Sequence, residues 1–215
     1  EFLLAVHYRE GRATEIGPAA LEKFLKVMSR AIQLGVSSSN LAVKDSGIMP
    51  GMVDPERFGV VYGAGRMTCH PSELAAAVEV CRSEGGVDIS KWGQQALNEV
   101  APLWLLRQMP NMPASHVSID HNACGPNNTI TSRDASALLA LSEAVRVIEA
   151  NRADCMIVGA CSSNIHPVDI AKFHSFEGLS RRSDDPKRAC RPFDFEREGA
   201  VVGEGAASFM VESYE

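Results

Sequence analysis

The chain has 215 residues, of which 45% are hydrophobic and 22% charged, and its formal net charge is −6 at pH 7. This length and composition are typical of a globular protein with a sizeable core, in one large domain or two small ones. The acidic balance argues against nucleic acid as the main partner, because phosphate binding requires a basic face. No apolar run approaches the roughly 18 residues that span a bilayer, so no membrane span is expected.

The cysteines and the N-terminal residues indicate a cytoplasmic protein. The N-terminal stretch "EFLLAVHYREGR" lacks the basic start, apolar middle and cleavage site of a signal peptide. No two cysteines form a C-x-x-C pair, and scattered cysteines of this kind are usually free thiols in a reducing compartment. The six are Cys69, Cys81, Cys124, Cys155, Cys161 and Cys190.

The first predicted elements are a helix, a strand and a second helix. Residues 19–34, "AALEKFLKVMSRAIQL", have apolar residues at helical spacing, and Gly35 is the expected stop. Residues 57–65, "RFGVVYGAG", form a β-branched and aromatic run that ends in glycines, which predicts a strand and a tight turn. Residues 72–83 predict a helix with Ser72 as its N-cap.

The middle of the chain predicts a helix and then a short strand. Residues 93–108 have helical character, and Pro110 and Pro113 end that pattern. The next stretch reads as one short strand with His116 and His121 near its two ends. None of the six histidines has a metal-binding spacing such as H-x-x-x-H, so no metal site is expected.

The last third alternates strands and helices. A buried strand is expected near 127–132, a helix over 135–149 and a strand over 153–161, and the polar stretch 180–199 reads as a surface loop. The helix is apolar almost all round in its first half, which predicts burial. Together these elements predict an α/β protein with a central sheet covered by helices on both faces.

The turn between the 127–132 strand and the following helix holds Asp134, flanked by Arg133 and Ala135. A helix N-terminus presents unpaired N–H groups and roughly half a positive elementary charge. That environment lowers the pKa of a thiol and activates it as a nucleophile. It also stabilises an aspartate, which can act as a helix N-cap.

The turn "GAGRMT" resembles the start of a dinucleotide-binding fingerprint. The third glycine of G-x-G-x-x-G is missing, because Gly63 and Gly65 are followed by Arg66, Met67 and Thr68. A plain strand-to-helix turn is therefore the favoured interpretation. A dinucleotide-binding oxidoreductase stays open as a remote alternative.

Several segments in order resemble the β-ketoacyl synthase family. They include "MPNMPASHVSI", "GPNNTITSRDAS", "RPFDFEREG" and "GEGA", and the resemblance is weak before residue 57 and strong after residue 109. It implies the thiolase-like fold, here its N-terminal half, which is a mixed sheet of five-stranded type. It also implies carbon–carbon bond formation in fatty acid and polyketide synthesis, with no cofactor.

Members of that family have a nucleophilic cysteine in a setting like T-A-C-[ST]-S-G, and an ungapped alignment places it on Asp134. Cys124 is a rival thiol but lies ten residues earlier, before the strand. The replacement of the cysteine by Asp134 leaves enzyme activity uncertain, and the resemblance then implies a non-condensing or chain-length-setting subunit. The alternative, that Asp134 is only a helix N-cap, stays open. A further alternative is retained acyl-thioester chemistry, as a malonyl decarboxylase or acyltransferase. The resemblance also aligns Trp104 with an acyl-pocket aromatic.

The resemblance further implies partners and missing parts. The expected partners are acyl carrier protein or acyl-CoA thioesters, and a homodimer mate or an active ketosynthase in a heterodimer. Family catalysis uses two histidines and a lysine from the C-terminal half, beyond "GEGA". Residues 1–215 are therefore expected to be a partial N-terminal domain, without the family's first strand and its C-terminal half, from a longer protein.

Overall fold

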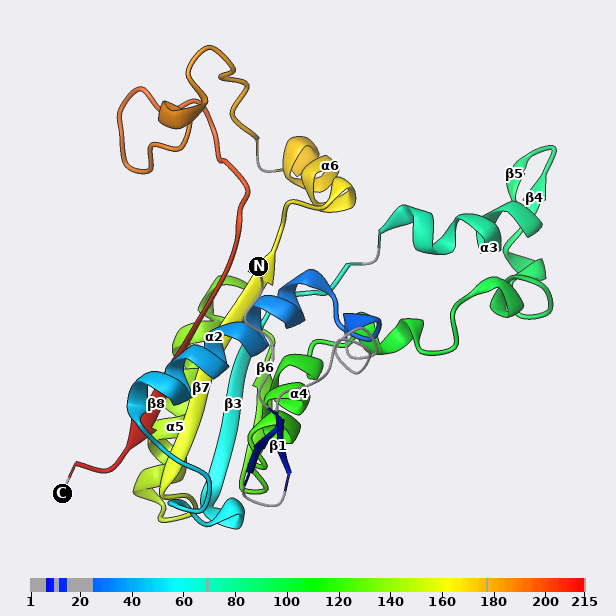
Figure 1. Cartoon of the computed structure of the whole chain (residues 1–215). Helices are drawn as coiled ribbons and strands as arrows, with labels where there is room; N and C mark the ends of the chain where they lie inside the picture. Colours follow the sequence, from blue (N-terminus) through cyan, green and yellow to red (C-terminus); the bar gives the residue numbers. More distant parts are fainter. Residues whose placement is uncertain (1–6, 10–11, 15–24, 69, 177, 215) are drawn as a thin grey trace. The chain divides into compact units, whose positions relative to one another are not determined.

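The computed structural model describes residues 7–9, 12–14, 25–68, 70–176 and 178–214 (Figure 1). The chain divides into two compact units, and each is described by itself. Unit 1 contains the main sheet and comprises the chain up to Met67, Leu103–Ser162 and the residues from Gly205 on; unit 2 comprises Thr68–Pro102 and Ser163–Glu204.

The main sheet has four strands in the described residues, in the order β6-β3-β7-β8. They are β6 (Asn127–Ile130), β3 (Phe58–Ala64), β7 (Cys155–Ser163) and β8 (Glu204–Glu212). Strand β3 lies parallel to both of its neighbours, β6 and β7. Strands β3, β6 and β7 form where the sequence predicts strands, so the expected α/β class is confirmed.

Helices α2 (Arg30–Ser46) and α4 (Met112–Asp120) cover one face of this sheet. Alternate residues of β3 and β7 point to that face, among them Val60, Tyr62 and Ile157, all fully buried. Alternation is the natural period of a strand, so the intervening residues must point to the opposite face.

That opposite face packs against α5 (Ser136–Glu149). Its core joins Val61, Met156 and Val158 of the sheet to helix residues that include Ala140 and Ala144. The sheet is thus covered by helices on both faces, as the sequence predicts.

The first predicted helix is displaced. Residues 19–24 lie outside the described residues, and α2 continues through Gly35 to Ser46, followed by Gly47 as the C-cap with a left-handed φ of 72°. A Cβ added at Gly35 would lie 3.1 Å from the Cys161 Sγ and 3.2 Å from a ring carbon of Tyr62. The glycine therefore allows close packing of α2 on the sheet and does not stop the helix.

The two predicted helices of residues 72–108 are much shorter than expected. His70, not Ser72, caps the first, as the 3-10 turn Pro71–Leu74 leads into α3 (Ala75–Val80). Residues 93–108 form only two 3-10 turns, Ala96–Glu99 and Trp104–Arg107. Pro102 lies between them and cannot continue a helix.

The expected strand with His116 and His121 is a helix instead. Pro113 lies in the first turn of α4, where a missing N–H is tolerated, so this proline starts the helix. The buried side chains of His116 and Asp120 are consequently one helical turn apart.

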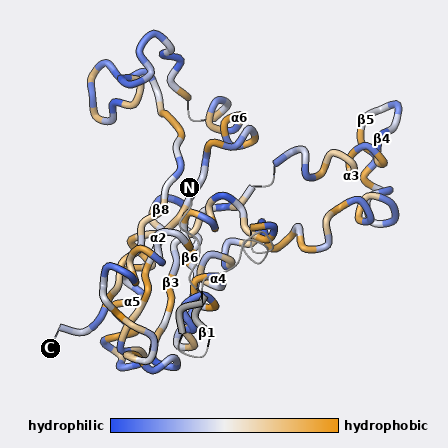
Figure 2. The backbone as a smooth tube through the Cα atoms, in the orientation of Figure 1, coloured by the Kyte–Doolittle hydropathy of each residue, from blue (hydrophilic) through white to orange (hydrophobic). Residues whose placement is uncertain are grey.

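The remaining elements are short, apart from one helix that the sequence did not predict. That helix is α6 (Pro167–Phe176), and the charged stretch after it is mostly irregular, as expected, and largely hydrophilic (Figure 2). The other elements are the hairpins β1–β2 (His7–Arg9, Arg12–Thr14) and β4–β5 (Arg82–Ser83, Gly86–Val87), and the 3-10 turns Pro55–Arg57, Ile89–Lys91, Arg133–Ala135 and Pro186–Arg188.

A buried hydroxyl cluster joins α2, β3 and β8. The Tyr62 hydroxyl donates to the Gly35 carbonyl at 2.7 Å and lies 2.7 Å from the Ser39 Oγ and 2.6 Å from the Ser208 Oγ. The Ser38 Oγ lies 2.7 Å from the Ser208 Oγ. Burial raises the pKa of Tyr62, so the phenol stays neutral and can donate.

We expect Tyr62→Phe to lower the free energy of unfolding by about 1–3 kcal/mol, because it leaves a buried carbonyl and two serine hydroxyls without their partner. The measurement is urea unfolding followed by circular dichroism. Tyr214 is fully exposed, so Tyr214→Phe should change the same quantity by less than about 0.5 kcal/mol. Equal stabilities of the two variants would contradict this account of the cluster.

Candidate functional site

The turn that follows β6 leads directly into α5. The strand ends at Ile130, a 3-10 turn covers Arg133–Ala135, and α5 begins at Ser136. Asp134 lies in this turn, as the sequence predicts. Arg133 has a φ of 50°, in the left-handed region that residues with a Cβ adopt only at a cost. A strained turn at the start of a helix is a feature of functional sites.

Ser136 holds this turn in place. The Ser132 N–H donates to the Ser136 Oγ at 2.8 Å, and that hydroxyl donates to the Arg133 carbonyl at 2.7 Å. Ser136 is only 3% exposed. The side chain that fixes the turn is therefore a buried serine two residues after Asp134.

Two expectations about Asp134 are wrong. We expected its carboxylate to accept a backbone N–H of the first helical turn, but it is exposed and forms no such bond with the described residues. The Ser136 hydroxyl already fixes the turn, so no carboxylate cap is needed. We also expected a buried strand before the turn, whereas β6 lies at the edge of the sheet and its residues are exposed or half-exposed.

The turn rests on β3 through a close backbone contact. A Cβ added at Gly63 would lie 2.6 Å from the carbonyl carbon of Ser136 and 2.8 Å from the amide nitrogen of Ala137. Only glycine allows the first turn of α5 to approach the strand this closely. This contact gives Gly63 a packing role, which removes the reason to interpret "GAG" as a phosphate-binding loop.

Helix α5 is not buried all round, contrary to expectation. Four of its residues are buried (Ser136, Ala140, Ala144 and Val147), and they lie along one stripe. Its other side exposes Leu138 by 74%, Leu139 by 44% and Val145 by 40%. The apolar composition predicted a covered helix, but the described residues cover only the stripe that faces the sheet.

Cys124 does not lie at a helix N-terminus. It follows α4 in the loop before β6, where its N–H donates to the Pro55 carbonyl at 2.8 Å. Its side chain is exposed, and its Sγ lies 3.7 Å from the Asn122 carbonyl oxygen. No helix N-terminus acts on this thiol, which agrees with its rejection as the nucleophile.

The buried thiols are poor nucleophiles. Burial raises the pKa of Cys155 to about 11 and that of Cys161 to about 12. Both remain protonated at neutral pH, and a thiol reacts only as the thiolate. The five cysteines that the structure describes are all free, so the expectation of thiols is confirmed for them.

Sequence reasoning missed a cluster at the end of α4, formed by His116 and Asp120 of the helix and His121, which follows it. His116 and His121 flank Asp120, and the Nε2 atom of each imidazole is buried without a hydrogen-bond partner in the described part of the chain. Burial lowers the pKa of both histidines, and the nearby Asp120 opposes this shift. The two imidazoles are thus held neutral inside the fold.

We expect stability to fall on acidification because of these histidines. The pKa of both histidines is lower in the folded chain than the ~6.5 of an unfolded histidine. Their contribution to the free energy of unfolding is therefore fully present above pH ~6.5 and declines below it. Each can add up to about 1.4 kcal/mol per pH unit to the slope. Urea unfolding at pH 7.5 and 5.5 should show a smaller pH effect in His116→Gln than in the parent. The exposed His174→Gln should keep the parental pH effect, and a matching loss in both variants would contradict this assignment.

Trp104 lies in the 3-10 turn before α4 and is half-buried. Its indole Nε1 is buried and has no hydrogen-bond partner among the residues that the structure describes. A buried indole N–H normally has an acceptor. This arrangement suits an indole whose hydrogen-bond acceptor is supplied by another molecule or segment.

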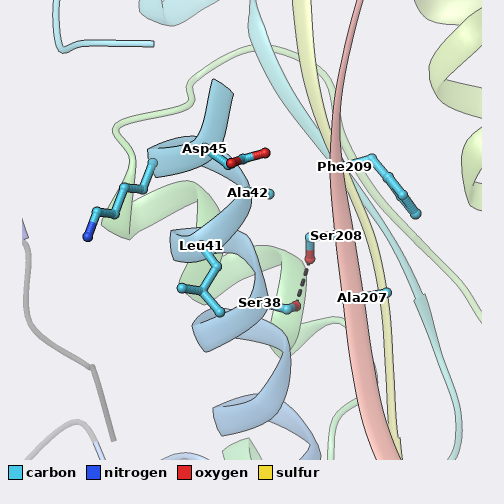
Figure 3. A pocket seen from close by; sticks show the side chains of 8 residues that line it. Ser38, Leu41, Ala42, Asp45, Ala207, Ser208 and Phe209 are labelled. Carbon is cyan, nitrogen blue, oxygen red and sulfur yellow. Dashed lines mark hydrogen bonds between the residues drawn. The ribbon is translucent and has the colours of Figure 1, made fainter. Parts of the chain in front are cut away.

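A shallow groove runs between α2 and β8 (Figure 3). Leu41 of the helix is 59% exposed, and Phe209 of the strand is 61% exposed with its ring pointing away from α2 (Figure 3). The Ser38 and Ser208 hydroxyls are hydrogen-bonded to each other, so the groove offers no activated nucleophile. Its lining is Ser38, Leu41, Ala42, Lys44, Asp45, Ala207, Ser208 and Phe209.

Among the described residues, no group of three or more His, Cys, Asp or Glu side chains could hold a metal ion. None of the described helices has the length and apolarity needed to cross a membrane.

Comparison with known proteins gives one family. The model of the β-ketoacyl synthase N-terminal domain matches residues 15–215. The chain is 33% identical over 219 residues to the tetracenomycin polyketide synthase ketoacyl synthase alpha subunit of Streptomyces glaucescens, covering 97% of this chain and 48% of that protein. It is 31% identical over 199 residues to 3-oxoacyl-[acyl-carrier-protein] synthase 2 of Vibrio cholerae, covering 90% and 44%. The chain thus spans about half the length of these relatives.

The fold agrees with a solved structure. The crystal structure of a β-ketoacyl synthase from Burkholderia phymatum superposes with a TM-score of 0.73 at 25% identity, covering 99% of this chain and 50% of that one. The thiolase-like fold that the sequence implies is therefore confirmed.

Proposed function

The chain belongs to the β-ketoacyl synthase family, as its N-terminal domain, and from that premise we propose that it is part of a non-condensing subunit of fatty acid or polyketide synthesis. The observation that supports this proposal is Asp134 in the strained turn before α5. In the family, the nucleophilic cysteine lies in that turn, and no described thiol of this chain takes its place.

A carboxylate at residue 134 cannot do the chemistry of a thiolate. Attack of a carboxylate on an acyl thioester would give a mixed anhydride, which is less stable than the thioester it came from. Transfer of the chain to Asp134 would therefore run uphill. The subunit keeps the architecture of a condensing enzyme and lacks the group that holds the growing chain.

The proposed partner is a chain of the same family, either a second copy or an active ketosynthase. Strand β6 is at one edge of the sheet, and in the described residues it pairs only with β3. A free strand edge favours pairing with another strand. Two sheets joined at β6 would form one continuous sheet across a twofold axis.

Trp104 supports a role in setting chain length. The family resemblance places it at an acyl pocket, and its half-buried indole has an unused N–H donor. A large aromatic ring at such a pocket would narrow the space for an acyl chain. The acyl groups themselves would be delivered as thioesters of acyl carrier protein or coenzyme A, in the cytoplasm.

Co-expression of the full-length protein with an active ketosynthase tests this proposal. We expect the two to co-purify, and we expect Trp104→Ala in this subunit to shift the products of the pair towards longer chains. Light scattering should show a dimer at micromolar concentration. A monomer, or products unchanged by the substitution, would contradict the proposal. Release of CO2 from malonyl thioesters by the protein alone would instead favour a decarboxylase.

A further inference from the structure

Unit 2 contains a pair of histidines that the proposed function does not use. His70 precedes the 3-10 turn Pro71–Leu74, and His166 precedes α6. Their ring centroids are 5.5 Å apart and the ring planes meet at 82°, an edge-to-face arrangement. Two residues 96 positions apart in the sequence thus bring their imidazoles together.

The hydrogen bonds of both rings favour a proton on Nε2. The Ser72 N–H donates to the His70 Nδ1 at 3.4 Å, and the Ser72 hydroxyl lies 2.7 Å from the same atom. The Val168 N–H donates to the His166 Nδ1 at 3.2 Å. A nitrogen that accepts a backbone N–H carries no proton, so each neutral imidazole must carry its proton on Nε2. Each ring therefore has its Nε2–H as the donor that these bonds leave unused.

One of these donors lacks an acceptor. The His166 Nε2 is shielded from solvent and has no hydrogen-bond partner in the part of the chain that the structure describes. The neighbouring His70 is exposed, so the pair lies at the surface of unit 2. A buried N–H donor without an acceptor marks a place where an acceptor atom would be stabilised.

Two nearby acids each accept a hydrogen bond from a neighbouring group. Asp169, in the first turn of α6 and 8% exposed, accepts the Thr68 hydroxyl at 2.5 Å and lies 3.5 Å from the Lys172 ammonium. The backbone N–H of His70 donates to the Glu73 carboxylate at 3.3 Å. The Asp169 charge is thus balanced by Lys172, and the Thr68–Asp169 bond holds the loop of His70 against the start of α6.

We propose that His70 and His166 form a binding site for an oxyanion, a carboxylate or a phosphate, held by the two Nε2–H donors. An oxyanion has two oxygens that can each accept one N–H, which suits two imidazole donors on rings whose centroids are 5.5 Å apart. The start of α6, a helix of ten residues, adds partial positive charge at the same place. The proposal does not depend on the role of Asp134.

A metal ion does not fit this pair. A metal would bind the Nε2 lone pair, and both Nε2 atoms carry the proton because their Nδ1 atoms accept hydrogen bonds. Binding would require both rings to change tautomer and lose their bonds to Ser72 and Val168. The pair is thus arranged to donate hydrogen bonds.

Calorimetric titration of the full-length protein with sodium phosphate and, separately, sodium malonate tests the site. We expect saturable binding of at least one probe, and the better probe tells whether the site prefers a phosphate or a carboxylate. His166→Phe keeps the ring shape and removes the donor, so it should weaken that binding about tenfold or more, as should His70→Phe. His174→Phe, at the other end of α6, is the matched control and should leave binding unchanged.

Long-range nitrogen-15 NMR of the unchanged protein gives an independent reading, which holds even if a variant fails to fold. We expect both imidazoles in the Nε2–H form, with shifts that move on addition of the bound probe. No saturable binding of either anion, or binding that survives both substitutions, would overturn the proposal. An Nδ1–H form at either histidine would also overturn it.

Discussion

Replacing Gly63 by alanine should lower the free energy of unfolding by about 3 kcal/mol or more. A Cβ at this position would lie 2.6 Å from the Ser136 carbonyl carbon and 2.7 Å from its oxygen. These are backbone atoms at the start of α5, so no flexible side chain can move aside. Either β3 or the whole first turn of the helix must shift.

The intrinsic preference of a strand for alanine over glycine would by itself stabilise the variant, so a loss of stability must come from the contact. Alanine is better than glycine in regular structure by roughly 0.5–1 kcal/mol, so a Gly63 with free space above it would be stabilised by the change. Gly85 is the matched control, because a Cβ there meets nothing within 4 Å. Gly85→Ala should change the free energy of unfolding by less than about 0.5 kcal/mol. A Gly63→Ala variant as stable as the control would show that α5 does not rest on β3 as described.

Asp134→Cys should create an acyl-enzyme where the parent forms none. The substitution puts a thiol in the strained turn before α5, where the helix N-terminus lowers its pKa and favours the thiolate. Ser136 and Gly63 hold the turn through contacts that do not involve the residue 134 side chain. The turn should therefore keep its conformation after the change, and the introduced thiol should accept an acyl group from a carrier-protein thioester.

Two further variants separate the thiol from other effects. Asp134→Asn removes the charge without adding a thiol and should form no adduct. Cys124→Ser in the Asp134→Cys background should keep the adduct, because Cys124 lies in the loop before β6 and is not the acceptor. Absence of an adduct on Asp134→Cys, with the fold intact, would contradict the assignment of this turn as a nucleophile's seat.

The central strands and the helix after the turn could be predicted because their signals are local. β3 (FGVVYGA) and β7 (CMIVGACSS) are largely apolar runs without polar alternation, as is typical of buried parallel strands. α5 follows a clear turn and repeats apolar residues at helical spacing. The position of Asp134 followed from these elements and from the family resemblance.

The errors arose where tertiary contacts override local pattern. Gly35 looked like a helix stop, but its lack of a side chain is explained by Cys161 and Tyr62, which lie far along the chain. The stretch around His116 alternates like a strand, yet it packs as helix α4 against α2 and β3. The apolar residues of α5 indicate that a covering surface exists, and composition cannot say which molecule or segment provides it.

The fixing of the Asp134 turn by Ser136 and the pairing of His70 with His166 had no usable signal in the sequence. Ser136 was not distinguishable as the residue that fixes the turn, because its hydroxyl bonds backwards to Ser132 and Arg133. The two histidines meet only after the segments that follow β3 and β7 come together in unit 2. Such contacts depend on the fold and not on spacing in the chain.

The most direct test of the central claim is intact-mass spectrometry of the unmutated full-length protein after incubation with a long-chain acyl carrier protein thioester. If Asp134 fills the nucleophile's seat and no other residue replaces the missing thiol, the mass of the protein will not change. An acyl-sized mass increase that maps to Cys124 would contradict both the assignment of the seat and the non-condensing role.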